Sequence, residues 1–148
     1  MQSNYPLTVN FRDLMQRRQV APCSLADSVR EHVFLLLTTR FGECSHDATY
    51  GCELWEYDFD HPGDLDAQKH RLEKSIKTII EGHEPRLTRV SIKVTIDTQL
   101  FVDRFNKEHP VVKKKITIAV KGVLRETNQE FQPAPPYVIY FSPVSVQR

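Results

Sequence analysis

A change of hydrophobic period between residues 65 and 96 constrains the fold of this 148-residue chain more than any other feature. Before the change, apolar residues recur at helical spacing, at Leu65, Leu72, Ile76, Ile79 and Ile80. After it, apolar residues alternate with polar ones as in a half-buried strand, at Val90, Ile92, Val94 and Ile96. The chain must therefore turn from one buried helix directly into one buried strand.

The connector between that helix and strand carries an acid, a proline and a base. Gly82 is expected to take the left-handed conformation that ends a helix. Proline disfavours helical backbone at the residue before it, Glu84, and Pro85 fixes its own φ and donates no hydrogen bond. In an extended connector, residues two apart project to the same side, so Glu84 and Arg86 should be presented together on a stiff corner.

Two more helices are predicted earlier in the chain. Residues 10–18 can form a short helix. Ser24 should be the N-cap of a second helix, with Asp27 three residues on as in a capping box. An apolar stripe makes this helix a core element, through Leu25, Val29, Val33, Leu36 and Leu37.

The third helix should begin after an N-cap at Asp64 and run over about residues 65–81. Glu73 and Lys77 would form an i, i+4 pair on its exposed face. Between the second and third helices, residues 40–62 are mostly irregular, with a short strand expected at 53–59.

Strands are predicted at residues 87–97, 114–124 and 137–141, with 98–112 able to extend the first and 127–135 as a polar connection. Helices therefore come first and strands later. This order predicts an α+β fold in which N-terminal helices pack against a small, mainly antiparallel sheet of three to four strands.

Composition indicates a single domain over residues 1–148, with a core at about 24–142 and an N-terminal extension at 1–23. The chain is 40% hydrophobic, and its net charge of +1 argues against a nucleic-acid partner. The longest strongly apolar run, residues 33–37, is far too short to span a membrane. Three cysteines do not make a disulfide framework, so we expect a cytoplasmic protein without membrane insertion.

Charge is unevenly distributed along the chain. Residues 40–66 contain one basic and eight acidic residues, whereas residues 104–126 contain seven basic and two acidic ones. This asymmetry suits a part with an acidic side and a basic side that meet different neighbours. An unevenly charged but solvated surface is the alternative.

Three stretches together resemble a known family: Leu35 to Glu43 (LLLTTRFGE), Tyr50 to Leu54 (YGCEL), and Glu84-Pro85-Arg86-Leu87 after an isoleucine-rich helix. In their order and spacing they are similar to the phage baseplate wedge family, also called GPW-like, whose bacterial counterpart is the type VI secretion protein TssE. The resemblance covers roughly residues 25–123.

The resemblance implies a structural role without catalysis or cofactor, despite the word lysozyme attached to some relatives. It implies TssF-like and TssG-like wedge subunits and the first sheath ring as partners. It carries the protein-binding role to Glu84, Pro85 and Arg86. Residues in or near the matching stretches are expected to support that interface: Arg40, Gly42, Glu43, Tyr50, Gly51 and Arg89.

Two physical hypotheses follow for the corner. Glu84 and Arg86 can make directed, charge-assisted hydrogen bonds at a subunit joint, with Pro85 lowering the cost of ordering. Alternatively, the pair only staples the helix–strand turn within the domain. The resemblance further implies that part of the strand region offers a sheet edge to a sheath strand, and that the run of Lys113, Lys114 and Lys115 keeps that edge from self-association. The sequence does not identify the strand, and residues 116–120 and 138–141 are the stretches in which proline substitutions would test it.

Other chemistries have weaker sequence signals. A peptidoglycan hydrolase would recruit Glu84 with Glu43 or Asp47, but it needs a carboxyl group of raised pKa, and Glu84 beside Arg86 should stay ionised. A zinc-binding domain would use Cys44, His46, Cys52 and His61, although no Cys-x-x-Cys is present. Cys23, before an N-cap, has no indicated base partner for nucleophilic catalysis. We therefore predict no catalytic residue and no metal ligand.

Overall fold

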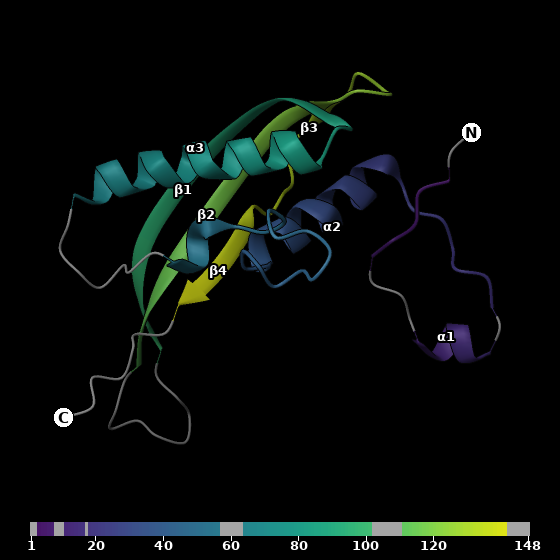
Figure 1. The fold of residues 1–148 in the computed structure, drawn as a ribbon, viewed down its shortest axis with the longest axis horizontal. Coiled ribbons are helices and arrows are strands. Elements are labelled where there is room, and N and C mark those ends of the chain that lie inside the picture. Colours follow the sequence, from purple (N-terminus) through teal and green to yellow (C-terminus); the bar gives the residue numbers. More distant parts are fainter. Residues whose placement is uncertain (1–2, 8–10, 17, 57–63, 102–110, 142–148) are drawn as a thin grey trace.

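A computed structural model describes residues 3–7, 11–16, 18–56, 64–101 and 111–141. Its elements run from the helices at the N-terminal end to the strands at the C-terminal end (Figure 1). They are α1 (Phe11–Met15), α2 (Leu25–Thr38), the 3-10 turn η1 (Glu53–Glu56), α3 (Leu65–His83), β1 (Leu87–Phe101), β2 (Val111–Leu124), β3 (Glu130–Phe131) and β4 (Tyr137–Phe141).

The sheet is built around β2, which pairs with β1 on one side and with β3 and β4 on the other. All of these pairings are antiparallel. The core contains buried residues from α2 and α3 together with those from one face of the sheet, so both helices cover that face. The predicted α+β architecture is confirmed.

Periodicity identified most of the core, although Leu65 at the start of α3 is 46% exposed and Leu25 and Ile79 are only partly buried. In α2, Val29, Val33, Leu36 and Leu37 are buried. In α3 the buried residues are Leu72, Ile76 and Ile80, and in the sheet they include Val90, Val94, Ile116, Ile118 and Val120. The alternation in β1 and β2 therefore does reflect one buried and one solvated face.

Both predicted N-caps are confirmed. Ser24 Oγ accepts the Asp27 amide at 3.1 Å, and its hydroxyl donates to the Asp27 carboxylate at 2.6 Å. Asp64 Oδ1 accepts the amides of Asp66 and Ala67. Each cap satisfies first-turn N–H groups that have no partner within the helix, which explains why both helices begin where they do.

The end of α3 differs from the prediction. The helix continues through Gly82 to His83, and Glu84 is the C-cap. Among the described residues the glycines with positive φ are Gly42 and Gly51, so Gly82 does not end the helix. The connector is also not extended: the Leu87 amide donates to the Glu84 carbonyl at 3.2 Å, so Pro85 and Arg86 occupy the two central positions of a tight turn.

Three other expectations need correction. Residues 53–56 form the 3-10 turn η1 instead of a strand, and Tyr57 and Phe59 lie outside the described residues. The polar connection after β2 contains the two-residue strand β3. Lys77 pairs with Glu81 at 3.9 Å instead of with Glu73.

Glu73 reaches across to the sheet. Its Oε1 accepts the Val94 amide at 2.9 Å, so this N–H of β1 points away from β2. Because β2 is the one strand that pairs with β1 among the described residues, the outer edge of β1 would otherwise present unpaired amides here. Glu73 therefore covers one point of a free sheet edge.

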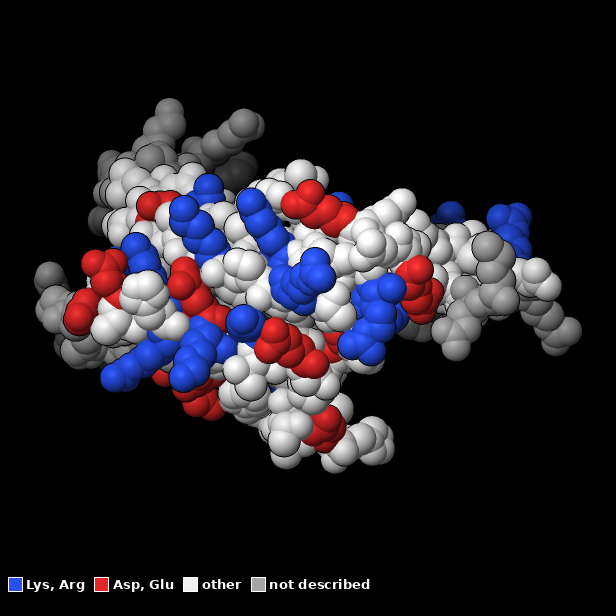
Figure 2. All heavy atoms as spheres, turned by 90° about the horizontal axis from the view of Figure 1, so that it is seen from above, with Lys and Arg blue, Asp and Glu red and all other residues white. Residues whose placement is uncertain are grey.

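Charge is not segregated on the face drawn in Figure 2. Lys and Arg side chains lie beside Asp and Glu side chains there, so neither sign covers this face alone. The basic run Lys113 to Lys115 lies in the central strand β2, opposite Gln99, Thr98 and Asp97, and does not protect an edge as expected. In the described parts of the chain, no helix is both long and apolar enough to cross a membrane.

The loop after α2 closes on the chain through Gly51. Cys52 N donates to Thr39 O at 2.8 Å, which brings the two segments together. Gly51 has a φ of +129°, and a Cβ on it would lie 2.7 Å from Arg40 O. Glycine is required at this position by both backbone conformation and space.

We predict that Gly51→Ala lowers the free energy of unfolding by about 3 kcal/mol, because strain and overlap with backbone combine. Gly42→Ala is the matched control. Gly42 also has positive φ, at +76°, but nothing lies within 4 Å of its added Cβ. Gly42→Ala should therefore lower the free energy of unfolding by only about 1 kcal/mol, through conformational strain alone. Urea unfolding of both variants measures this difference, and equal losses would contradict the steric argument.

Candidate functional site

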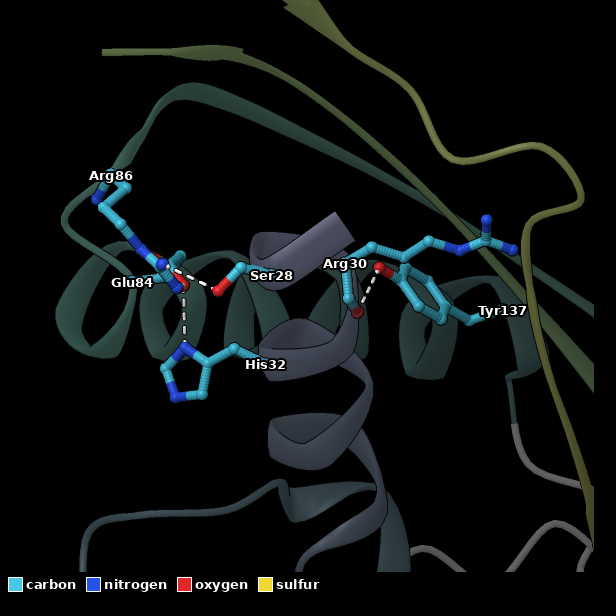
Figure 3. Close-up of polar contacts among 6 residues, drawn as sticks. All are labelled: Ser28, Arg30, His32, Glu84, Arg86 and Tyr137. Carbon is cyan, nitrogen blue, oxygen red and sulfur yellow. Dashed lines mark hydrogen bonds and ion pairs between the residues drawn. The ribbon is translucent and has the colours of Figure 1, made fainter. Parts of the chain in front are cut away.

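A bidentate ion pair between Glu84 and Arg86 holds the corner between α3 and β1 (Figure 3). Arg86 Nε donates to Glu84 Oε1 and Arg86 Nη2 donates to Glu84 Oε2, each at 2.7 Å. The Arg86 amide also donates to Glu84 Oε1, at 3.2 Å. Glu84 is 1% exposed, so a buried carboxylate is satisfied by a residue two positions away.

Helix α2 completes this cluster from the other side. His32 Nδ1 lies 2.7 Å from Glu84 Oε2, and Arg86 Nη1 donates to Ser28 Oγ at 3.0 Å. Ser28 and His32 are four residues apart and therefore lie on one face of the helix. We call these four residues, Ser28, His32, Glu84 and Arg86, the corner clamp. It fastens α2 to the turn between α3 and β1.

Ser28 and His32 were not predicted as site residues. Their spacing of four on an amphipathic helix is the only sequence signal they carry, and that spacing does not identify a partner more than 50 residues away in sequence.

The clamp determines the protonation of Glu84. Burial alone would raise the pKa of this carboxyl group, but hydrogen bonds from Arg86 and His32 outweigh it and lower the pKa to about 2. The same hydrogen bonds to Glu84 raise the pKa of Arg86. Both side chains are therefore charged over the whole physiological range.

Tyr50 brings the preceding loop to the clamp. Its ring lies 5.9 Å from that of His32 and 5.3 Å, edge-on, from that of His83. His83 Nε2 lies 3.2 Å from Thr49 O, and Asp47 lies 3.9 Å from the same imidazole. Of the predicted support residues, Tyr50 is thus the one in contact with the clamp.

The other predicted support residues have separate environments. Glu43 accepts the Arg40 amide at 2.9 Å, and the Arg40 guanidinium lies 5.4 Å from the centre of the Trp55 ring. Gly42 and Gly51 shape the same loop. Arg89 is exposed, with a φ of +52°, where the pairing of β1 with β2 shifts register.

Only part of the corner is accessible to another protein. Pro85 is exposed at the tip of the turn, and the Arg86 side chain is 29% exposed. Glu84 is enclosed, so it can hold Arg86 in place but has no surface to offer directly. The arrangement can therefore present a proline and one edge of a fixed guanidinium group.

The geometry does not suit the competing chemistries. A general acid needs a carboxyl group of raised pKa, whereas Glu84 is ionised and enclosed and Glu43 is engaged by the Arg40 amide. Cys52 is buried, and burial raises the pKa of its thiol to about 11, which disfavours metal binding. No group of His, Cys, Asp or Glu among the described residues could hold a metal ion; His61 lies outside that part of the chain.

Because of the clamp, we predict that the stability difference between the wild type and Glu84→Gln depends on pH in the acidic range. The pKa of Glu84 is lower in the folded chain than the ordinary value of 4.5, so ionised Glu84 stabilises the fold above about pH 4.5 and this stabilisation is lost as pH falls toward 2. Glu84→Gln should therefore be less stable than the wild type by about 3 kcal/mol at pH 7. The difference should shrink to about half by pH 3. Urea unfolding between pH 3 and 7 measures it, and a difference that does not change with pH would contradict the assignment.

Comparison with known proteins identifies the family of this chain. A family model described as baseplate wedge protein gp25 matches residues 23–129, which is well over half of the chain. A comparison with curated proteins finds no match.

A crystal structure from Geobacter sulfurreducens, described as a "putative tail lysozyme", has a similar fold. Its TM-score is 0.54 at 17% sequence identity, over 87% of this chain and 100% of that one. At this identity the likeness concerns the fold alone. The family match covers α2, α3, the corner clamp and the β1–β2 hairpin. The chain therefore belongs to the family of baseplate wedge protein gp25, whose members are structural components of contractile tail baseplates.

Proposed function

We propose that this protein is a TssE-like wedge subunit of a contractile injection machine of the type VI secretion kind. In this proposal it acts in the cytoplasm, joins TssF-like and TssG-like wedge subunits, and contacts the first ring of the sheath. Family membership supports the baseplate role, and the Glu84-Pro85-Arg86 motif supports the finer assignment.

The observation that carries the proposal is that Arg86 is fixed on three sides before any partner binds. Glu84 holds it with two hydrogen bonds of 2.7 Å, and Ser28 holds its third nitrogen. Binding of a partner carboxylate or carbonyl at the exposed edge of Arg86 therefore costs little conformational entropy, because that side chain is already ordered. The clamp then has two roles: it holds the helix–strand turn together within the domain, and it presents Arg86 to a partner subunit.

The sheath contact is proposed at a sheet edge. The predicted candidate at residues 116–120 is largely ruled out, since β2 is the central strand and β4 pairs with its residues 114–118. Among the described strands, β1 lies at one edge of the sheet, and β4 and the two-residue β3 lie at the other. On β1, Val94 N–H points outward, and alternation in an antiparallel strand then turns the amides of Ile96, Thr98 and Leu100 outward as well. An added sheath strand would pair with this open stretch beyond Glu73.

The joint role is tested by separating stability from binding. Arg86→Ala should lower the free energy of unfolding by about 3 kcal/mol, because it leaves the buried Glu84 charge without its main partner. Below its melting temperature it should also fail to co-purify with TssF-like and TssG-like subunits. Arg89→Glu, which is exposed and outside the clamp, should weaken that co-purification without a comparable loss of stability.

Lys93→Glu on the exposed face of β1 is the control for a general charge effect. If folded Arg86→Ala and Arg89→Glu both bind the wedge subunits like the wild type, the joint role is wrong and the clamp only stabilises the domain.

The edge role is tested with proline. Thr98→Pro removes an outward amide while leaving the β1–β2 hydrogen bonds in place, so the variant should fold but assemble less sheath. Thr98→Ala, which keeps the amide, should assemble sheath normally. Melting curves and sheath sedimentation of both variants give the answer. Normal sheath assembly by folded Thr98→Pro, and also by Tyr140→Pro on β4, would refute strand addition at these edges.

A further inference from the structure

The N-terminal arm, of which the structure describes residues 3–7, 11–16 and 18, is bound next to and on α2 at its base and lies apart from the core at its tip. Cys23 N donates to Asn4 O at 2.8 Å, and Leu7 N donates to Glu31 Oε2 at 2.5 Å. Beyond these contacts comes α1, none of whose residues is buried. Figure 1 shows α1 at the far end of the molecule from the sheet.

The tip of the arm exposes a concentrated apolar surface. Phe11 is 79%, Leu14 48% and Met15 87% exposed. The segment is also held in shape, since Arg18 N donates to Asp13 O at 2.9 Å and the two side chains lie 3.8 Å apart. Three large apolar side chains on five residues would be costly to leave in water, so this surface is expected to be covered by protein.

A groove of about 690 Å³ between α2 and β4 has the complementary character. Its floor and walls are largely apolar, formed by Leu7, Phe34, Leu35, Pro135, Pro136 and Val138. Phe34 stacks on Tyr137 at 6.3 Å, and the Tyr137 hydroxyl donates to Arg30 O at 2.9 Å, which fixes the wall. Phe34 and Leu35 are still 49% and 41% exposed.

Charge is complementary as well. Asp27 and Glu31 lie at the groove with Arg30, so the carboxylates outnumber the one cation. The described part of the arm's tip has the opposite balance, with Arg12 and Arg18 against Asp13. Opposite charges around two apolar surfaces favour contact between them and suppress contact of either surface with itself.

The arm and β4 also lie outside the part of the chain that matches the family, residues 23–129. The groove therefore forms where the two unmatched ends of the chain meet on α2.

We infer that α1 of one copy docks in the α2–β4 groove of a second copy, and that the two copies exchange arms about a two-fold axis. Each copy has both halves of the contact, but its own α1 is directed away from its own groove by the pinned base. A two-fold pair buries both apolar tips and fills both grooves. Because each arm contributes only a few side chains, the interface is small and the dimer is weak.

The test is sedimentation equilibrium of the full chain over a range of concentrations up to about 100 µM, which detects a dimer with a Kd of that order. The wild type should shift from monomer toward dimer. An arm variant, Phe11→Ser with Met15→Ser, and a groove variant, Phe34→Ser, should each remain monomeric. Phe41→Ser, a 37%-exposed phenylalanine away from the groove, should dimerise like the wild type.

Mixing supplies the decisive measurement. The arm variant keeps an intact groove and the groove variant keeps an intact arm, so an equimolar mixture can form one of the two contacts. Because one contact replaces two, heterodimer should appear in the mixture only above the concentration at which the wild type dimerises, although neither variant self-associates there. A wild type that is monomeric at every concentration, whether its groove is empty or filled by its own α1, overturns the inference. So does an arm variant or a groove variant that dimerises like the wild type.

Discussion

The buried carboxylate of Glu84 is the constraint on which the corner depends. A charge that is 1% exposed is tolerated only when its hydrogen bonds are complete, and here Arg86 and His32 supply them. Removing Arg86 leaves this charge without its cation in the protein interior, whereas removing His32 takes away one contact to Oε2. The ion pair therefore need not contribute much net stability to be indispensable for the shape of the corner.

The clamp joins α2 to the turn between α3 and β1. Glu84 ends α3, Arg86 precedes β1, and Ser28 and His32 lie on α2. The Arg125 amide also donates to Arg86 O at 2.8 Å, which joins the far end of β2 to the same residue. Four segments thus meet at one guanidinium–carboxylate pair. The planar geometry of arginine allows only one arrangement of these segments, which a lysine at position 86 would not specify.

Local signals predicted much of this from sequence. The elements followed from period and caps, and the motif stood out because Pro85 lies between two opposite charges. The predictions that failed depend on contacts between elements that are distant in sequence, which local patterns do not specify. Gly82 stays helical although glycine is a poor helix former, because Ile80 is buried and His83 contacts Thr49. Ser28 and His32 have no local pattern that identifies Glu84. The bond between Glu73 and Val94 forms only once α3 lies against β1, and β3 is too short to show a period.

Strand β1 links the two proposed partner surfaces mechanically. It begins next to the clamp at Leu87 and ends at Phe101, a span of about 45 Å for a strand of this length. Its pairing with β2 continues without a shift from Ser91 to Phe101, and Glu73 fixes its outer edge near the middle. The inner face of β1 from Leu87 to Val94 belongs to the core, and a packed interior resists bending. In the proposed function, a wedge subunit bound at the corner would therefore set the position of the adjoining open edge, where a sheath strand would add.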